Sequence, residues 1–347
     1  MSNQAQALHN ESIIIDGLFF QIYTPVPHGA GEPPSDLLLD HIQASGVTVF
    51  NHSVIIDSFP VSIEQALWNL YQDSAIFETF PDRVLQVRSV ADIKRAKDEG
   101  KVGIIFGTQG LACVGIHLHY IWVLYNLGVR IMQITYNERN ALGSGCMEPT
   151  DHGLTRFGQQ VIDEMGRLGI VLDLSHCGHR TSLDAIARST NPMLFTHVGV
   201  KALCDHPRNV TDEQIKAVAE AGGVIGLCPH SIMVEKRRGE HPSVHDFIDH
   251  IDYVVQLVGI DHVGIGTDNF QYDTFYSRLR RSVFERAFPT FFGGYGMDQK
   301  HVEGFRRWSD WPNLTACLLE RGYSPEDVKK ILGGNFLRVF AEVWRSA

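Results

Sequence analysis

The strongest constraint on the fold is a regular alternation of short apolar runs with longer amphipathic segments along almost the whole chain. Eight apolar runs are candidate strands, at 12–16, 47–51, 102–106, 130–135, 170–175, 193–197, 224–228 and 262–267. They are almost continuously apolar, which is typical of strands buried on both faces of a parallel sheet. Helical patterns lie between them at 35–45, 90–99, 117–127, 154–168, 181–189, 212–221 and 246–258. The alternation therefore predicts repeated β/α units.

This number of β/α units in succession matches a closed parallel (β/α)8 TIM barrel, an α/β fold. Glycines support the same boundaries, because they occur where helical patterns should end, at Gly46, Gly100, Gly128 and Gly169. A doubly wound open sheet is the alternative. However, the first strand leads into Asp-Gly-Leu-Phe-Phe at 16–20, which lacks the glycine-rich turn of a dinucleotide-binding sheet. The barrel is the favoured fold class.

The length of 347 residues suits one such barrel with additions. After the last strand, 269–311 is long and rich in aromatic residues and arginine, which predicts a lid or a partner surface. Helical patterns in 313–346 would close the barrel. We expect a single domain over 1–347 and a homodimer or larger homo-oligomer, with 269–311 at the interface or over the barrel mouth. An ordinary intramolecular cover is the alternative for that segment.

The charge and cysteine content exclude several classes of function. The 30 Lys and Arg against 40 Asp and Glu give a net charge of −10, which is unfavourable for nucleic-acid binding. Apolar runs are far shorter than the roughly 20 residues of a membrane-spanning helix, and the polar first residues predict no secretory leader. The six cysteines form no Cys-x-x-Cys pair, as in reduced proteins. We expect a cytoplasmic protein without nucleic-acid or membrane partners.

Polar residues at the predicted strand ends indicate where chemistry would occur, because barrel active sites lie at the carboxyl ends of the strands. His176 follows the fifth predicted strand and His197 ends the sixth. Two imidazoles at consecutive strand ends would converge, which is a common arrangement for a catalytic metal. Asp268 follows the last strand and is a candidate general base or further ligand. For each residue alone, a structural hydrogen bond is the alternative role.

Four further polar residues belong to the same predicted mouth. Gln109 and Tyr136 lie at the ends of two other strands, and Arg208 lies in the loop after the sixth. This arginine is a candidate for binding a substrate carboxylate, with a surface or capping role as the alternative. Cys146 lies in a glycine-rich loop at 143–153 and is a candidate substrate contact. A thiol without an activating partner is more often a passive buried residue.

Several motifs together resemble the membrane (renal) dipeptidase family of zinc peptidases. They occur in family order and at matching spacing, as GLTRFGQQVIDEMGRLGIVLDLSH, LFTH, HPRNVTDEQ, GIGTD and NFLRVFAEVW. The resemblance covers nearly the whole chain. It implies an amidohydrolase-type (β/α)8 barrel, usually dimeric, that hydrolyses dipeptides, tolerates a D-residue at the C-terminal side and uses two bridged zinc ions.

The resemblance implies roles for four residues that are present. His176 and His197 match the two histidines of the second zinc site. Arg208 matches the arginine that holds the substrate carboxylate. Asp268 matches the aspartate that handles the proton of the attacking water and of the leaving amine.

The chain departs from the family pattern at other positions. Leu18 and Phe20 stand where the strand-one motif has a histidine and an aspartate that hold the first zinc, and neither side chain can bind a metal. Gln109 aligns with the bridging glutamate, and a neutral amide is a weak zinc ligand. Tyr136 aligns with a histidine that contacts the substrate. These differences predict one zinc ion per chain or none, held by His176 and His197.

Three functions are compatible with this pattern. The first is a dipeptidase-like hydrolase with a single metal, acting on a dipeptide or a similar small carboxylate-bearing amide. The second is a metal-free acid/base enzyme that acts on a non-peptide small molecule through Tyr136, His176, His197 and Asp268. The third is a non-catalytic binding protein on the same barrel.

Overall fold

The computed structural model describes residues 2–19, 36–57, 61–268 and 295–345. Within these ranges the strands are all parallel to their neighbours. They are β1 Ile15–Phe19, β2 Val49–Ile56, β3 Val84–Val87, β4 Val102–Gln109, β5 Val129–Gln133, β6 Val171–Asp173, β7 Leu194–Val198, β8 Val224–Leu227 and β9 Val263–Ile265.

Eight of these strands close into a barrel. The order runs β2, β1, β9, β8, β7, β6, β5 and β4, and a direct pairing of β2 with β4 completes the ring. The extra strand β3 pairs with the first half of β4, from Val102 to Ile105, while β5 pairs with the second half. Each of the eight predicted strands overlaps a barrel strand, so the predicted (β/α)8 class is confirmed. The four-residue strand β3 was not predicted.

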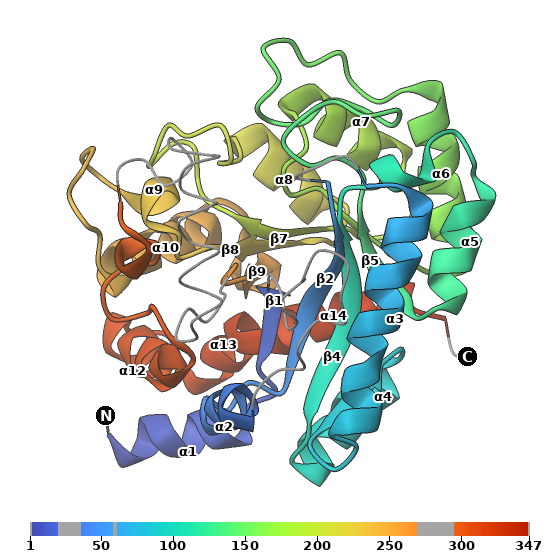
Figure 1. The fold of residues 1–347 in the computed structure, drawn as a ribbon. Helices are drawn as coiled ribbons and strands as arrows, with labels where there is room; N and C mark the ends of the chain where they lie inside the picture. The colour runs from blue at the N-terminus through green and yellow to red at the C-terminus, as the bar shows by residue number, and fades with distance from the viewer. Residues whose placement is uncertain (1, 20–35, 58–60, 269–294, 346–347) are drawn as a thin grey trace.

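Helices surround the barrel (Figure 1). They are α1 Asn3–Glu11, α2 Asp36–Ala44, α3 Ile63–Thr79, α4 Val90–Glu99, α5 His119–Asn126, α6 Arg156–Leu168, α7 His179–Arg188, α8 Asp212–Glu220, α9 Ser231–Val234, α10 Val244–Val258, α12 Trp311–Arg321, α13 Pro325–Lys329 and α14 Asn335–Val343. Within the helical patterns predicted in 313–346, α13 continues into a π-helical turn, Lys330–Gly334. The sequence patterns missed α1, α3 and α9.

Local sequence explains where several helices begin and end. Thr211 caps α8 in a capping box with Gln214, which satisfies backbone N–H groups that a helix N-terminus leaves without partners. The predicted glycine stop after α6 is confirmed, because Gly169 adopts the left-handed conformation at φ 77°. These boundaries place the loops after β6 and β7 at the barrel mouth.

The amino-terminal end of the barrel is closed by α14. Its Phe336 packs in an apolar cluster with Ile15 of β1 and Val49 of β2. Gly17 and Gly264 leave room for this ring, because a Cβ atom at either position would lie within 3.0 Å of a Phe336 ring carbon. The barrel interior is therefore filled at this end, and the polar side chains lie at the opposite, carboxyl end.

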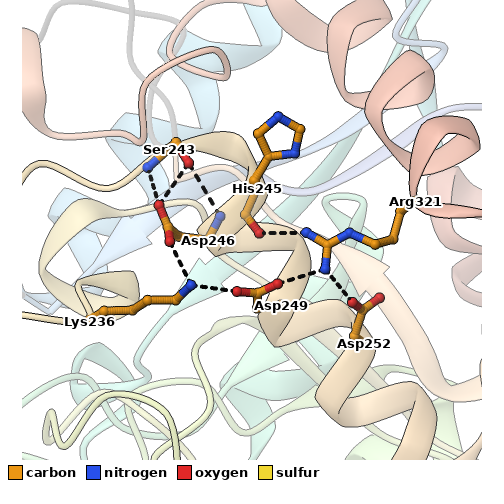
Figure 2. A network of polar contacts seen from close by, with 7 residues as sticks. All are labelled: Lys236, Ser243, His245, Asp246, Asp249, Asp252 and Arg321. Carbon is orange, nitrogen blue, oxygen red and sulfur yellow. Dashed lines mark hydrogen bonds and ion pairs between the residues drawn. The ribbon is translucent and has the colours of Figure 1, made fainter.

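A polar network fixes α10 against its neighbours (Figure 2). Lys236 pairs with Asp246 and Asp249 at 2.8 and 2.6 Å, while Arg321 of α12 pairs with Asp249 and Asp252, both at 2.7 Å. Burial raises the pKa of Asp246, but its hydrogen bonds and the Lys236 charge outweigh this and lower it to about 2. All these side chains are partly exposed, so the network orients α10 more than it stabilises the fold.

The predicted lid at 269–311 lies largely outside the described residues. Its described part begins at Tyr295 and crosses the ends of β8 and β9, where His301 forms a backbone bridge with His230. In the described part of the chain, no helix is long and apolar enough to cross a membrane.

Candidate active site

Two histidines converge at the barrel mouth, as the sequence predicts. His197 lies on β7, and His176 lies just beyond β6 at φ 64°. This left-handed backbone is uncommon for a residue other than glycine and turns the side chain toward the barrel axis. The Nε2 atoms of the two rings lie 2.9 Å apart. Both side chains are buried, with relative exposures of 4% and 1%.

The partners of the opposite ring nitrogens determine which nitrogen carries the proton. His176 Nδ1 lies 2.6 Å from Asn137 Oδ1, an acceptor, so Nδ1 donates. His197 Nδ1 lies 2.8 Å from Thr196 Oγ1, whose own proton goes to Asp173 Oδ2 at 2.7 Å. The hydroxyl must therefore accept from His197. In both neutral rings the proton sits on Nδ1, and the Nε2 lone pairs face one another.

The surroundings favour the neutral form of both rings. Burial is the largest cause that lowers the pKa of His176 and His197 well below the usual value, and the positive charge of Arg208 lowers both further. Two facing lone pairs at 2.9 Å repel, so the pair is suited to hold a cation or a shared proton between the rings. Two zinc–nitrogen bonds of about 2.0–2.1 Å at a tetrahedral angle separate the nitrogens by about 3.4 Å. A small outward movement of the rings would fit one ion.

Tyr136 and Arg208 flank the histidine pair. The Tyr136 ring stacks on His176, with ring centroids 4.1 Å apart and an interplanar angle of 23°. Arg208 is 8% exposed and donates from Nη2 to the His197 carbonyl oxygen at 3.0 Å. This bond fixes the guanidinium beside the pair, and the guanidinium also hydrogen-bonds the Cys146 side chain. A carboxylate is the natural partner for the N–H fork of a guanidinium.

A cavity opens beside these residues. Its volume is about 390 Å³, and it is lined by His176, Arg208, Cys146, Phe195 and Val198, among others. Burial raises the pKa of the Cys146 thiol against the opposing charge of Arg208, so the thiol stays protonated at neutral pH. The cavity lining combines the Arg208 guanidinium and the Lys201 ammonium with polar and apolar side chains, which suits a small molecule that carries a carboxylate.

Asp268 has a partner that the sequence did not indicate. Its backbone, at φ 48°, follows β9, and its carboxylate Oδ2 lies 3.2 Å from the ammonium of Lys300. The same ammonium donates to the Asp268 carbonyl oxygen at 2.5 Å. Lys300 is 0% exposed. A lysine in the polar stretch Asp-Gln-Lys-His reads as solvent-exposed, so no sequence signal marks its burial.

Leu18 and Phe20, at the positions where the family pattern has metal ligands, carry side chains that cannot donate to a metal. Leu18 is buried, and its carbonyl oxygen accepts a hydrogen bond from the Asp268 backbone N–H at 2.9 Å. Phe20 lies outside the described residues. Gln109 is buried and donates from Nε2 to Ser53 Oγ at 2.9 Å. Over the described ranges, no group of three or more His, Cys, Asp or Glu side chains is placed to hold a metal ion.

Asp16 shows how this side of the mouth is fixed instead. Its carboxylate accepts hydrogen bonds from the Thr267 backbone and hydroxyl at 2.7 and 2.5 Å, and thereby links β1 to the end of β9. Burial raises its pKa to about 7, against these hydrogen bonds. The residue before Asp268 is thus held by strand one.

The comparisons with known proteins agree with this architecture. A model of the membrane dipeptidase family (peptidase family M19) matches residues 3–276 and 291–347. The chain belongs to the membrane dipeptidase family. The recognition made from the sequence motifs is confirmed.

Among family relatives, dipeptidase tcpJ of Claviceps purpurea is 30% identical over 270 residues, which are 77% of this chain and 57% of the relative. Dipeptidase aclJ of Aspergillus oryzae is 30% identical over 268 residues, with 76% and 57% covered. The match thus spans little more than half the length of these relatives. A solved amidohydrolase from Pseudomonas aeruginosa superposes with a TM-score of 0.85 at 33% identity, covering 98% of this chain and 99% of that chain.

Proposed function

We propose that this chain is a hydrolase that cleaves the amide bond of a dipeptide or of a similar small carboxylate-bearing amide. The observation that carries the proposal is the facing pair of Nε2 lone pairs on His176 and His197, 2.9 Å apart, beside a cavity that contains Arg208. This combination offers one centre for activating water and one for binding a carboxylate. Relatives named dipeptidases support the same class of reaction.

The residues fit one metal ion but not two. His176 and His197 would hold a single ion, and zinc suits two neutral imidazoles whose opposite nitrogens donate to fixed partners. A second ion does not fit, because Leu18 and Phe20 offer no donor and Gln109 offers only a neutral amide, which is a weak zinc ligand. When bound, a single ion would supply Lewis-acid activation of water at neutral pH.

The protein's own residues would perform the remaining steps. Arg208 binds the substrate carboxylate through its fork of N–H groups and thereby places the scissile amide near the histidine pair. Asp268 accepts a proton from the attacking water and returns it to the departing amine. Tyr136 holds His176 in place through their stacked rings and would contact the substrate. Cys146 contributes a neutral wall to the cavity.

A metal-free acid/base enzyme is the second candidate. It is favoured by the Nε2–Nε2 separation of 2.9 Å, which is also the length of a good hydrogen bond with one shared proton. The same four side chains, Tyr136, His176, His197 and Asp268, would then transfer protons on a non-peptide substrate. A binding protein without turnover would use the same cavity.

Three measurements on the purified full-length chain separate these candidates. The first is metal content without added zinc and after reconstitution, the second is release of amino acid from a panel of dipeptides and N-acyl amino acids, and the third is thermal stabilisation by the same compounds. A hydrolase with one ion approaches one equivalent of metal and loses turnover on chelation. Activity that survives chelation indicates the metal-free enzyme. Stabilisation by a ligand without turnover indicates a binding protein.

Light scattering tests the remaining prediction about assembly. We infer a homodimer or larger homo-oligomer from the arginine and aromatic residues of 269–311. A monomer at micromolar concentration would contradict it.

A further inference from the structure

Lys300 is a buried cation that contacts two oxygen atoms of Asp268. Its ammonium lies 2.5 Å from the Asp268 carbonyl oxygen and 3.2 Å from Asp268 Oδ2. The side chain of Lys300 is 1% exposed and that of Asp268 is 15% exposed. Burying a lone ammonium costs several kcal/mol. The pair therefore depends on both members.

The backbone around Lys300 is firmly held. The Lys300 carbonyl accepts a hydrogen bond from the Ser231 backbone N–H at 2.7 Å, and His301 Nε2 lies 2.7 Å from the Thr267 carbonyl oxygen. These contacts tie the segment to the start of α9 and to the residue that precedes Asp268. The ammonium is therefore a fixed feature of the mouth and not a surface side chain that happens to fold inward.

Several groups on which the Lys300 charge acts are kept neutral by burial. Burial lowers the pKa of His197, His230 and His301, and the Lys300 charge lowers each further. Burial raises the pKa of the Cys228 thiol to about 12. Lys300 thus supplies positive charge on the side of the mouth where strand one supplies no metal ligand. Leu18, at one of those vacant ligand positions, accepts the Asp268 backbone N–H.

We propose that Lys300 is a built-in cation that replaces the metal ion that strand one cannot bind, and that it orients Asp268 as a proton-accepting carboxylate. Lys300 is then a positioning residue, and Asp268 is not a metal ligand. The chain carries at most one ion, at His176 and His197. The role of Asp268 as a proton acceptor rests on the proposed hydrolase function. The claim that Lys300 balances the charge of Asp268 does not depend on that function.

The first test is a zinc titration by calorimetry on the full-length protein, with Asp268→Asn, Lys300→Met and His176→Ala as variants. We expect at most one equivalent in the wild type, with loss of binding in H176A. Asp268→Asn and Lys300→Met should keep the wild-type affinity within about threefold, because the proposal makes neither side chain a ligand, and the groups that orient the two histidines are Asn137 and Thr196. A loss of ten-fold or more in Asp268→Asn would make Asp268 a ligand and overturn the proposal.

The second test is a thermal unfolding cycle, which needs no substrate. Asp268→Asn removes this carboxylate from the buried Lys300 ammonium, and Lys300→Met removes the ammonium from the partly exposed Asp268 carboxylate. Each should lower the unfolding temperature by about 5 °C or more. The double variant should recover most of this loss. Lys330→Met, which removes an exposed ion pair of 2.7 Å with Asp261, is the matched control and should have little effect. A double variant no more stable than either single variant would overturn the pairing.

The third test separates a positioning role from a structural one. Lys300→Ala should lose at least about 100-fold in kcat on the best amide substrate, and added methylammonium should restore part of it, whereas tetramethylammonium should not. Full kcat in Lys300→Ala, or a loss that methylammonium leaves unchanged in a folded variant, would contradict the role. If the wild type hydrolyses no amide, the proposed function fails, while the titration and the unfolding cycle still decide the charge-balance claim.

Discussion

His176 and His197 present their Nε2 atoms to one another at 2.9 Å, and each ring is oriented by a partner on its other nitrogen. Asn137 accepts from His176, and Thr196, which donates to Asp173, accepts from His197. The chain thus has the tautomers and the orientation of a metal-binding pair, while Leu18 of β1 occupies a position where the family pattern has a metal ligand. This relationship connects the fold to the proposed chemistry.

Thr196→Val tests the control of the His197 tautomer. The change keeps the side-chain shape but removes the acceptor for Nδ1–H, so His197 loses its fixed tautomer and orientation. Metal affinity or activity should fall about 10–100-fold, measured by zinc titration and by kcat/KM. Thr315→Val is the control, because it breaks another buried Thr–His contact, at 2.8 Å to His9, between α1 and α12. Equal losses in both variants would argue against a specific role for Thr196.

Arg208→Lys tests the carboxylate site. A lysine keeps the charge but loses the planar fork, so kcat/KM for carboxylate substrates should fall at least about 10-fold, mostly through a higher KM. The preference for a free carboxylate over its amide should also shrink. Arg188→Lys is a matched control on the surface, where the residue pairs with Asp163. An unchanged preference in Arg208→Lys would place the carboxylate elsewhere.

The buried histidines predict how stability depends on pH. Burial lowers the pKa of His206 and His250 to about 4 and of His301 to about 3, against 6.5 when unfolded. The unfolded chain therefore binds more protons below pH 6.5, and the stability present above that pH is lost as the pH falls toward 4. Each residue contributes up to about 1.4 kcal/mol per pH unit.

Asp16 acts with the opposite sign. Its pKa of about 7 in the folded chain lies above the unfolded value of 3.8. Its contribution to the free energy of unfolding is therefore present at low pH and declines as the pH rises from 4 to 7. More buried histidines have a lowered pKa than buried aspartates have a raised one. Urea unfolding should therefore show a net fall in the free energy of unfolding from pH 7 to pH 5. A flat or rising profile would contradict the buried neutral histidines.

Gly264→Ala tests the close packing of α14 under the barrel. A Cβ atom there would lie 2.6 Å from the Phe336 ring, so stability should fall by about 1–3 kcal/mol. Gly166→Ala in α6 is the contrasting change, since its Cβ atom would lie no closer than 3.6 Å to the neighbouring residues. This substitution should stabilise the helix by up to about 1 kcal/mol. Urea unfolding of both variants measures the difference. A neutral Gly264→Ala would mean that Phe336 moves freely.

The barrel could be predicted because its signals are local. Buried parallel strands are short apolar runs, and glycines mark helix ends such as Gly100 and Gly169. The strand β3 was missed because Val84–Val87 is only four residues long, which is too short for periodicity to be informative. The helix α3 was missed although Ser62 caps it.

The histidine pair could also be predicted, because His176 and His197 follow consecutive strands of the sequence. Consecutive strands are neighbours in a (β/α)8 barrel, so side chains at their ends lie close together. The Asp268–Lys300 pair could not. Lys300 reaches Asp268 across 32 residues of sequence, and its burial depends on how 295–301 crosses β8 and β9. The tautomers were equally hidden, since they depend on Asn137 and Thr196, two residues without a sequence signature.

The most direct test of the central claim is turnover by the wild-type chain reconstituted with one equivalent of zinc, measured as free amino acid released from a dipeptide panel. We expect hydrolysis of at least one dipeptide that ends in a free carboxylate, and we expect this hydrolysis to be lost on chelation and absent in His176→Ala. Turnover that persists in His176→Ala, or no release from any dipeptide by protein that carries one zinc ion, would contradict it.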